Sequence, residues 1–266
     1  MSSSVALHGV TVSYGTRAER VTALDDIDVS IEAGEYVTVI GSNGAGKSTL
    51  VNVIAGAVIP SAGQVRIGSA DVTRLPDNRR AGRVSRVFQD VTAGTCADLT
   101  IAENMALASL RERGRSPFRR ILSRRRTAEF HSELRHLGCG LEDRLKRPAG
   151  LLSGGQRQLV SLVMATMGDP AVLLLDEHTS ALDPSMAELV MNRTDTVVRE
   201  RGLTAVMVTH NMRHAALYGD RVLIMTQGRI VDDISGRERT ALTEDRLIAR
   251  FRDLAGGEIT DRIIGV

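Results

Sequence analysis

The segment 41–49, GSNGAGKST, has the residue types and spacing of a loop that wraps nucleotide phosphates, here called the P-loop. Its glycines let the backbone turn tightly and direct N–H groups at phosphate oxygens. Lys47 is expected to reach the β- and γ-phosphates, and Ser48 to ligate Mg²⁺. By itself the loop indicates ATP or GTP. The nucleotide-binding residues predicted here are Gly41, Ser42, Asn43, Gly44, Ala45, Gly46, Lys47, Ser48 and Thr49.

A second set of chemical groups follows an apolar run at 172–177, VLLLDE, which fits the Walker B pattern. Mg²⁺ prefers hard oxygen ligands and keeps several waters. Asp176 is therefore expected to bind the ion or one of its waters, and Glu177 to polarise the attacking water. Two solvated carboxylates at a strand end are the alternative, which the four preceding apolar residues and the upstream P-loop disfavour.

A third motif, LSGGQ at 152–156, places small residues at an expected helix start. Ser153, Gly154 and Gly155 can form an anion site there. Together with the P-loop, this motif resembles the nucleotide-binding subunits of ABC (ATP-binding cassette) systems. The resemblance implies that 153–156, including Gln156, closes over ATP held by a second subunit. It therefore implies a homodimer, or a dimer with a similar ATPase subunit, that has two composite sites.

The same resemblance assigns four further residues. Gln89, in VFQD, matches the loop that senses the γ-phosphate or Mg²⁺, and His210 matches the residue that donates to the γ-phosphate. Asp183 matches the segment that crosses the dimer axis, and Tyr14 matches the aromatic residue that stacks on adenine. Each such residue alone is usually surface or capping. The predicted catalytic residues are Lys47, Gln89, Glu177 and His210, and the predicted Mg²⁺ ligands are Ser48, Gln89 and Asp176.

Strands alternating with helices predict an α/β fold with a mainly parallel sheet. The resemblance implies a P-loop NTPase core, an N-terminal antiparallel β subdomain and an inserted α-helical subdomain. We expect an ABC ATPase domain at 1–235, with the helical insertion at about 93–168, and a short C-terminal extension at 236–266. Strands are expected at 5–13, 21–31, 36–40, 64–67, 84–88, 172–175, 205–208 and 222–225. Helices are expected at 47–57, 100–111, 127–137, 154–167, 184–201, 212–217 and 242–254.

The composition limits the class of protein. No apolar run reaches the roughly 18 residues of a membrane span, and the first residues do not form a signal peptide. Two cysteines, Cys96 and Cys139, suggest no disulfide framework. A net charge of +2 gives no argument for nucleic acid.

We therefore expect an ATP-hydrolysing subunit that powers solute transport through separate transmembrane permease subunits. It would lie peripherally at the cytoplasmic face of the cell membrane and, as in importers, serve an extracytoplasmic solute-binding protein. A soluble ABC ATPase of assembly or scaffolding, as in iron–sulfur cluster biogenesis, has nearly the same motifs and is the alternative. DNA-repair ATPases of this family carry a long coiled coil between the P-loop and LSGGQ, and the interval here is too short for one. Translation factors of the family normally hold two cassettes in one chain, and this chain holds one. The intact set of Lys47, Asp176, Glu177 and His210 disfavours a non-hydrolysing module.

Two features lie outside these motifs. His178 follows Glu177 where most of the family has proline, a variant that we associate with importers of amino-acid-like solutes. It could place an extra titratable group near the site or merely mark lineage. The segment 111–126 holds eight arginines and one glutamate. It is either a solvated loop or a contact with anionic lipid or with an acidic permease surface.

Overall fold

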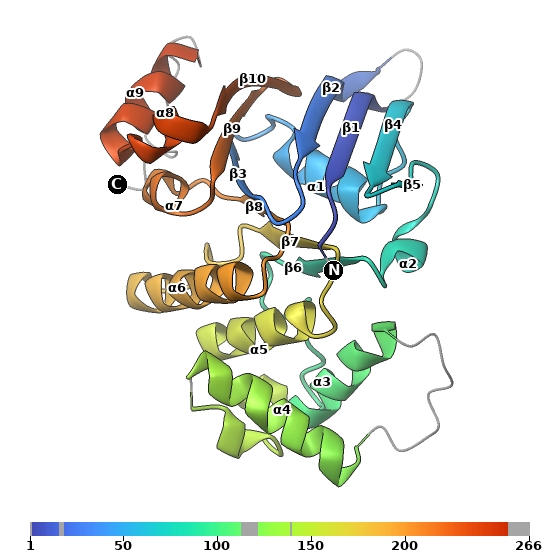
Figure 1. Cartoon of the computed structure of the whole chain (residues 1–266), viewed down its shortest axis with the longest axis vertical. Coiled ribbons are helices and arrows are strands. Elements are labelled where there is room, and N and C mark those ends of the chain that lie inside the picture. The colour runs from blue at the N-terminus through green and yellow to red at the C-terminus, as the bar shows by residue number, and fades with distance from the viewer. Residues whose placement is uncertain (1, 16–18, 113–121, 139, 255–266) are drawn as a thin grey trace.

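Two β-sheets and several layers of helices build the fold (Figure 1). The computed structural model describes residues 2–15, 19–112, 122–138 and 140–254. Among these residues, no helix is both long enough and apolar enough to cross a membrane.

The larger sheet is six-stranded, in the order β10-β9-β3-β8-β7-β6. Its strands β9, β3, β8, β7 and β6 run parallel, and β10 pairs antiparallel with β9 at one edge. Every residue of β3, β7 and β8 is buried, as expected for parallel strands covered on both faces. The strands are β3 (Tyr36–Gly41), β6 (Val84–Val87), β7 (Val172–Asp176), β8 (Ala205–Val208), β9 (Arg221–Thr226) and β10 (Arg229–Ile234).

Alternate residues of each strand enter different cores. In β7, Leu173 and Leu175 join a core with the helices α3 (Ile101–Ala108), α4 (Arg124–Leu137), α5 (Gly154–Thr166) and α6 (Pro184–Glu200). Val172 and Leu174 face the opposite side and join a core with α1 (Lys47–Ala55). This alternation follows from the two-residue period of a strand.

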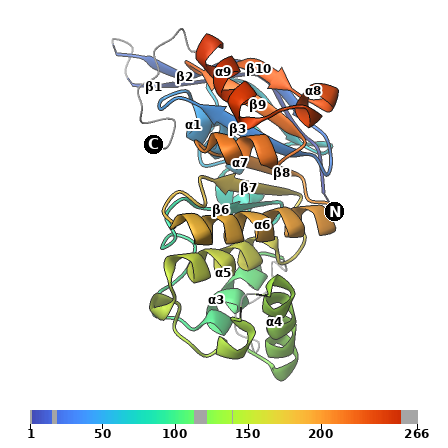
Figure 2. The same cartoon turned by 90° about the vertical axis from the view of Figure 1, so that its left-hand side faces the viewer.

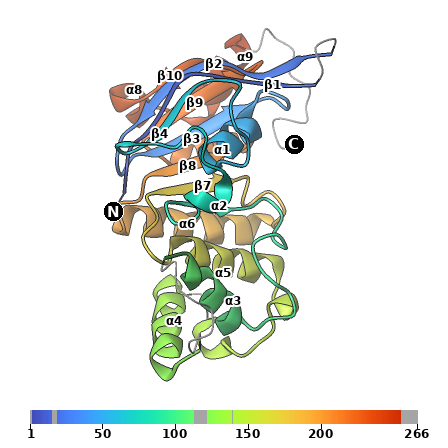
Figure 3. The ribbon, with the colours of Figure 1, turned by 90° about the vertical axis from the view of Figure 1, so that its right-hand side faces the viewer.

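A four-stranded antiparallel sheet, in the order β2-β1-β4-β5, covers α1 from the other side (Figure 3). Its inward side chains share the core of α1, so this helix lies between the two sheets. The strands are β1 (Val5–Tyr14), β2 (Val21–Ile31), β4 (Ala62–Ile67) and β5 (Ala70–Asp71).

The helices α3, α4 and α5 lie together at the end of the molecule away from the antiparallel sheet, in both views of Figures 1 and 2. Thr100 begins α3 with a capping box to Glu103, and Ser109–Glu112 continues it as a 3₁₀ turn. Within the described part of 93–168 no strand forms, only an isolated bridge between Thr100 and Pro148. These features confirm the predicted α/β class with a mainly parallel sheet, an N-terminal antiparallel sheet and an inserted helical part.

The last described residues pack onto the core. Helices α8 (Gly236–Thr240) and α9 (Glu244–Leu254) lie against α7 (Met212–Leu217) and β9 (Figure 2). Leu247 and Phe251 of α9 are buried there. The guanidinium of Arg239 donates to the carbonyls of Ala216 and Tyr218, at 2.7 and 2.8 Å. The limits 1–235 and 236–266 stay a prediction, although residues 236–254 share a core with the rest.

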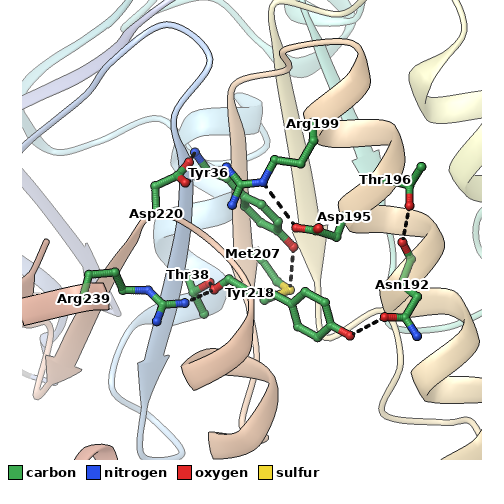
Figure 4. A network of polar contacts seen from close by, with 10 residues as sticks. All are labelled: Tyr36, Thr38, Asn192, Asp195, Thr196, Arg199, Met207, Tyr218, Asp220 and Arg239. Carbon is green, nitrogen blue, oxygen red and sulfur yellow. Dashed lines mark hydrogen bonds and ion pairs between the residues drawn. The ribbon is translucent and has the colours of Figure 1, made fainter. Parts of the chain in front are cut away.

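A polar network fixes the amino-terminal edge of the parallel sheet (Figure 4). The Tyr36 hydroxyl donates to Sδ of Met207, at 3.2 Å, and the Tyr36 N–H donates to Asp220, at 3.0 Å. Arg199 of α6 pairs with Asp220 at 2.6 Å and lies over the Tyr36 ring. This network ties α6 to the starts of β3 and β9, at the edge opposite the P-loop.

The structure differs from the sequence expectations mainly at element ends. Helix α1 stops at Ala55 rather than at 57, because Gly56 adopts a left-handed φ of 85° and its N–H turns back to the carbonyl of Val53. The short elements of the described part that had not been expected include β5, β10, α8 and a helix α2 (Asp77–Arg80).

Helix α2 brings a completely buried cation to the end of α1. The guanidinium of Arg80 donates to five backbone carbonyls, those of Leu75, Val53, Ile54, Val72 and Thr73. Two of these carbonyls belong to the last turn of α1, where a positive charge is favourable.

Replacing Arg80 by Met should lower the free energy of unfolding by roughly 3 kcal/mol, because a buried carbonyl left without its donor costs about 1–3 kcal/mol. Urea denaturation measures the change. Arg79→Met, an exposed neighbour on the same helix, is the matched control and should change stability by less than about 0.5 kcal/mol. Equal denaturation midpoints for the two variants would contradict the role given to Arg80.

Candidate active site

The carboxyl ends of four parallel strands form one edge of the sheet, and the predicted catalytic segments all begin there. In the strand register, Val208 of β8 lies beside both Val39 of β3 and Asp176 of β7. The P-loop follows β3, Glu177 follows β7, His210 follows β8, and Gln89 follows β6. In open parallel sheets ligands bind at this edge.

The P-loop turns closely against its surroundings. Gly46 has a φ of 98°, and a Cβ there would lie 2.5 Å from the carbonyl oxygen of Ala23. A Cβ at Gly41 would lie 2.4 Å from the carbonyl oxygen of Met225, so neither position tolerates a side chain. Gly46 is also the N-cap of α1 and brings no capping side chain, which leaves the first N–H groups of the helix available to an anion.

Lys47 folds back over the P-loop. Its Nζ donates to the carbonyls of Gly41 and Ser42, at 2.7 and 3.0 Å, and the side chain is buried. Burial lowers the pKa of Lys47, while the carboxylates of Glu177 and Asp176 act in the opposite direction. The other P-loop side chains are more open: Asn43 and Ser48 are exposed, and Ser42 and Thr49 are half-buried.

Glu177 and His210 face each other across the edge. Nδ1 of His210 lies 3.3 Å from Oε2 of Glu177. Glu177 has a φ of 44°, a left-handed conformation that is costly for a residue with a side chain, and its N–H donates to the carbonyl of Val208. The contact with His210 lowers the pKa of Glu177, and the same contact raises the pKa of His210. A carboxylate next to an imidazole can orient a water and pass on its proton.

Asp176 has a partner that the sequence analysis missed. Nη2 of Arg86, on β6, donates to Oδ2 of Asp176, and Nη1 donates to Asn52 of α1 at 2.8 Å. The guanidinium also lies 4.9 Å from the ring centre of Phe88, next to Gln89. Arg86 thus joins the Walker B carboxylate, the P-loop helix and the Gln89 loop. An arginine inside a short strand whose first and last residues are valines was the available signal.

The predicted metal ligands offer only oxygen donors: the hydroxyl of Ser48, the amide of Gln89 and the carboxylate of Asp176. Hard oxygens of this kind suit Mg²⁺, which keeps part of its water shell. Within the described ranges no three His, Cys, Asp or Glu side chains gather into a metal cluster. The assignment of Ser48, Gln89 and Asp176 as Mg²⁺ ligands stays a prediction, and their oxygen donors suit that ion.

The LSGGQ segment forms the start of α5. Ser153 is its N-cap, and a capping box joins its Oγ to the N–H of Gln156 and the Gln156 amide to the N–H of Ser153. Gly155 lies against Met186, where a Cβ would meet Cγ at 2.0 Å, and Gly154 faces Leu182. Gln156 thus has a local structural role that the sequence analysis had not assigned. Among the described residues, no hydrogen bond links this segment to the P-loop.

Helix α5 also supports the Gln89 loop, through residues that the sequence analysis had not singled out. Nε2 of Gln158 donates to the carbonyl of Phe88, at 3.1 Å, and Arg157 donates to Thr95. Gln89 itself is exposed. The start of the LSGGQ helix and the Gln89 loop are therefore mechanically joined.

The remaining predicted residues lie at the borders of the site. Asp183 is the N-cap of α6 and accepts from the N–H of Met186, at 3.0 Å, and from the Ser185 hydroxyl, bonds that lower its pKa. Tyr14 ends β1 and is 45% exposed, so the residue is accessible to a partner.

The arginine-rich run is described only at its ends, since 113–121 lie outside the described residues, as does Cys139. Arg125 pairs with Glu129 on the surface of α4, and Arg126 donates to Ser109. These contacts fit a solvated face and leave the lipid or permease contact a prediction. Cys96 is free and exposed.

Known proteins resemble this chain over most of its length. A family model described as ABC transporter matches residues 24–180. A tyrosine transport ATP-binding protein of Clostridioides difficile (strain R20291) is 41% identical over 230 residues, which cover 86% of this chain and 91% of that protein. The spermidine/putrescine import ATP-binding protein PotA of Thermobifida fusca (strain YX) is 37% identical over 227 residues, 85% of this chain and 56% of that protein.

A solved structure agrees with these relatives. The dimeric ATP-binding cassette MJ0796, in a post-hydrolysis state bound to ADP and Pi, matches with a TM-score of 0.74 and 29% identity, covering 87% of this chain and 98% of that one. The relatives are named for transport and import, which favours transport over the assembly alternative. This chain belongs to the ABC transporter family, in which it is an ATP-binding and ATP-hydrolysing subunit.

Proposed function

We propose that this subunit powers the import of an amino-acid-like solute through separate permease subunits, from a peripheral position at the cytoplasmic face of the membrane. A solute-binding protein outside the membrane would deliver the solute. The transport and import relatives support this proposal. The observation that carries the ATPase part is the meeting of Lys47, Asp176, Glu177 and His210 at one sheet edge.

The proposed working unit is a dimer. Ser153 begins α5 with exposed polar groups, and no described bond connects it to the P-loop of its own chain. In the dimer the P-loop of one subunit would face the LSGGQ segment of its partner. The matched cassette MJ0796 was solved as a dimer, which supports this arrangement.

The residues of the edge divide the reaction between them. Lys47 and the N–H groups of the P-loop bind and orient the phosphates, and Tyr14 stacks on adenine. When bound, Mg²⁺ would neutralise charge on the phosphate oxygens, held by Ser48, Gln89 and Asp176. Glu177 orients the attacking water and accepts its proton, while His210 keeps the carboxylate ionised and donates toward the γ-phosphate.

Affinity purification of the tagged full-length chain from its native membranes tests the transport role. Co-purification of a protein with several membrane spans supports it, and neighbouring genes for a permease and a secreted binding protein would add to that support. Recovery only with soluble assembly proteins, in detergent that preserves membrane complexes, would favour the alternative of an assembly ATPase.

Glu177→Gln should bind ATP but hydrolyse it at least about a hundredfold more slowly, because removing a general base typically costs 10²–10⁴-fold. Phosphate contacts remain, so the variant should accumulate as an ATP-bound dimer. Steady-state phosphate release and light scattering measure the two effects. Glu129→Gln, an exposed change on α4, should behave like the parent chain. Parent-like turnover of Glu177→Gln would remove Glu177 from its role.

The same variant should lower the pKa of His210 toward its ordinary value of about 6.5. The carboxylate of Glu177 is the main cause of the raised pKa, and an amide cannot stabilise the imidazolium in the same way. NMR titration of the labelled histidine, without nucleotide, measures the shift. An unchanged pKa would show that the two side chains do not interact in solution.

Ser153→Arg should leave ATP binding by the monomer intact and prevent the ATP-dependent dimer, because a bulky cation would fill the composite site from the partner's side. The change also removes a helix cap worth about 1 kcal/mol. Ser153→Asn, which retains a capping side chain, is the control for that loss. Nucleotide affinity and sedimentation velocity separate the two effects, and normal dimerisation of Ser153→Arg would rule out the composite site.

A further inference from the structure

His178 lies directly behind the proposed catalytic carboxylate. The left-handed turn at Glu177 sends the two neighbouring side chains in different directions. Glu177 is partly exposed and faces His210, whereas His178 is 2% exposed and enters the interior between β7 and α6. A polar ring that is buried without a hydrogen-bond partner destabilises the fold.

Thr194 of α6 is that partner, and the bond has a defined direction. Nε2 of His178 lies 3.1 Å from Oγ1 of Thr194. The Thr194 hydroxyl has a single proton and donates it to the carbonyl of Val190, at 2.8 Å. Oγ1 must therefore accept, and Nε2 of His178 must carry the proton that it donates.

The ring of His178 is buried as well as hydrogen-bonded. Complete burial, with His214 nearby, lowers the pKa of His178 to about 3. The sequence left open whether His178 adds a titratable group near the site or marks lineage. In the structure its ring is buried against α6, whereas the facing pair is Glu177 and His210.

Helix α6 is also the support for the histidine on the other side of the site. Asn211 caps α7 directly after His210, and His214 of α7 is buried with its Nε2 3.5 Å from Oε1 of Glu188 on α6. Both chain segments that carry the facing side chains, Glu177 and His210, are thus fastened to one helix.

The chain between Glu177 and α6 is short, and two hydrogen bonds from Ser180 close it into a turn. The Ser180 hydroxyl and N–H both donate to the carbonyl of Glu177, at 2.9 and 3.0 Å. The bond from His178 to Thr194 then ties this turn to the middle of α6, rather than to its end. A strained φ at Glu177 persists only if its surroundings fix it.

We propose that His178 is a positioning residue for ATP hydrolysis, whose bond to Thr194 holds the turn at Glu177 on α6 so that the carboxylate faces His210. The proposal rests on the proposed role of Glu177. His178 does not touch the reacting atoms. Its loss should therefore affect turnover more than nucleotide binding, which depends on the P-loop.

The test compares Thr194→Val, His178→Phe, the double variant and His178→Gln in the full-length chain. Thr194→Val is nearly isosteric and removes the hydroxyl, which both accepts from His178 and donates to the carbonyl of Val190. Each single change should lower kcat about tenfold, because small misplacement of a catalytic group is costly, and should leave the KM for ATP within about twofold. The double variant should be no slower than the single ones, and His178→Gln, whose amide can reach Thr194, should retain most of the activity.

Thr196→Val is the matched control. Thr196 lies on the same helix and also donates to a carbonyl four residues earlier, that of Asn192, but it is exposed. This variant should keep the parent kcat. Thermal unfolding of all variants separates a local effect from loss of the fold. If His178→Phe folds poorly, the kcat of Thr194→Val is the deciding measurement.

A parent-like kcat in Thr194→Val would overturn the proposal. It would also be overturned if the losses of the two single variants added up in the double variant and KM, Tm and kcat all changed together. Glu177→Gln is measured beside them. If Glu177→Gln keeps its turnover, the proposed role of Glu177 fails. If only Glu177→Gln is slow, that role stands and the role given to His178 is wrong.

Discussion

Burial of the parallel sheet on both faces is the constraint on which the rest of this molecule depends. The strands β3, β7 and β8 have no face on which a polar side chain can reach solvent. Chemistry is therefore confined to the strand ends, where the chain leaves the two cores. The register places Val39, Asp176 and Val208 in one row. Strands β7 and β8 end in that row and β3 ends two residues later at Gly41, so three loops leave the same edge of the sheet. This arrangement brings the predicted phosphate-binding loop and the segments of Glu177 and His210 to one edge.

At this edge, several charged side chains lie close to Glu177, whose backbone is strained. Lys47 lies over the carbonyls of its own loop, and Asp176 pairs with Arg86, so each charged group has a partner before any phosphate is considered. Glu177 is held in a left-handed conformation by its bond to the carbonyl of Val208 and by the turn that follows. Helix α6 contacts the segments that carry Glu177 and His210, through the bond of Thr194 to His178 and the contact of Glu188 with His214.

The opposite edge of the sheet serves stability and alignment. Tyr36, Arg199 and Asp220 bind β3, α6 and β9 together where those elements start or end (Figure 4). Arg239 caps the end of α7, whose beginning follows His210. The same helices, α6 and α7, therefore connect this polar network at one edge with the predicted catalytic residues at the other.

The sequence by itself determined the features that depend on residue type at short spacing. The P-loop, the apolar run before Asp176 and the helix start at LSGGQ could all be predicted. Phosphate binding, a strand covered on both faces and a helix start each require particular residue types at neighbouring positions. The helices and strands followed from the same local patterns, with errors where a single glycine such as Gly56 ends an element.

Only the tertiary structure decided which distant residues meet. Arg86 and Asp176 are 90 residues apart, and Gln158 and Phe88 are 70 apart, so no local pattern links them. The placement of β3 between β8 and β9 and the direction of the His178 ring are likewise set by packing. Such contacts arise because burial requires every polar group inside to find a partner, and the fold alone determines which partner lies within reach.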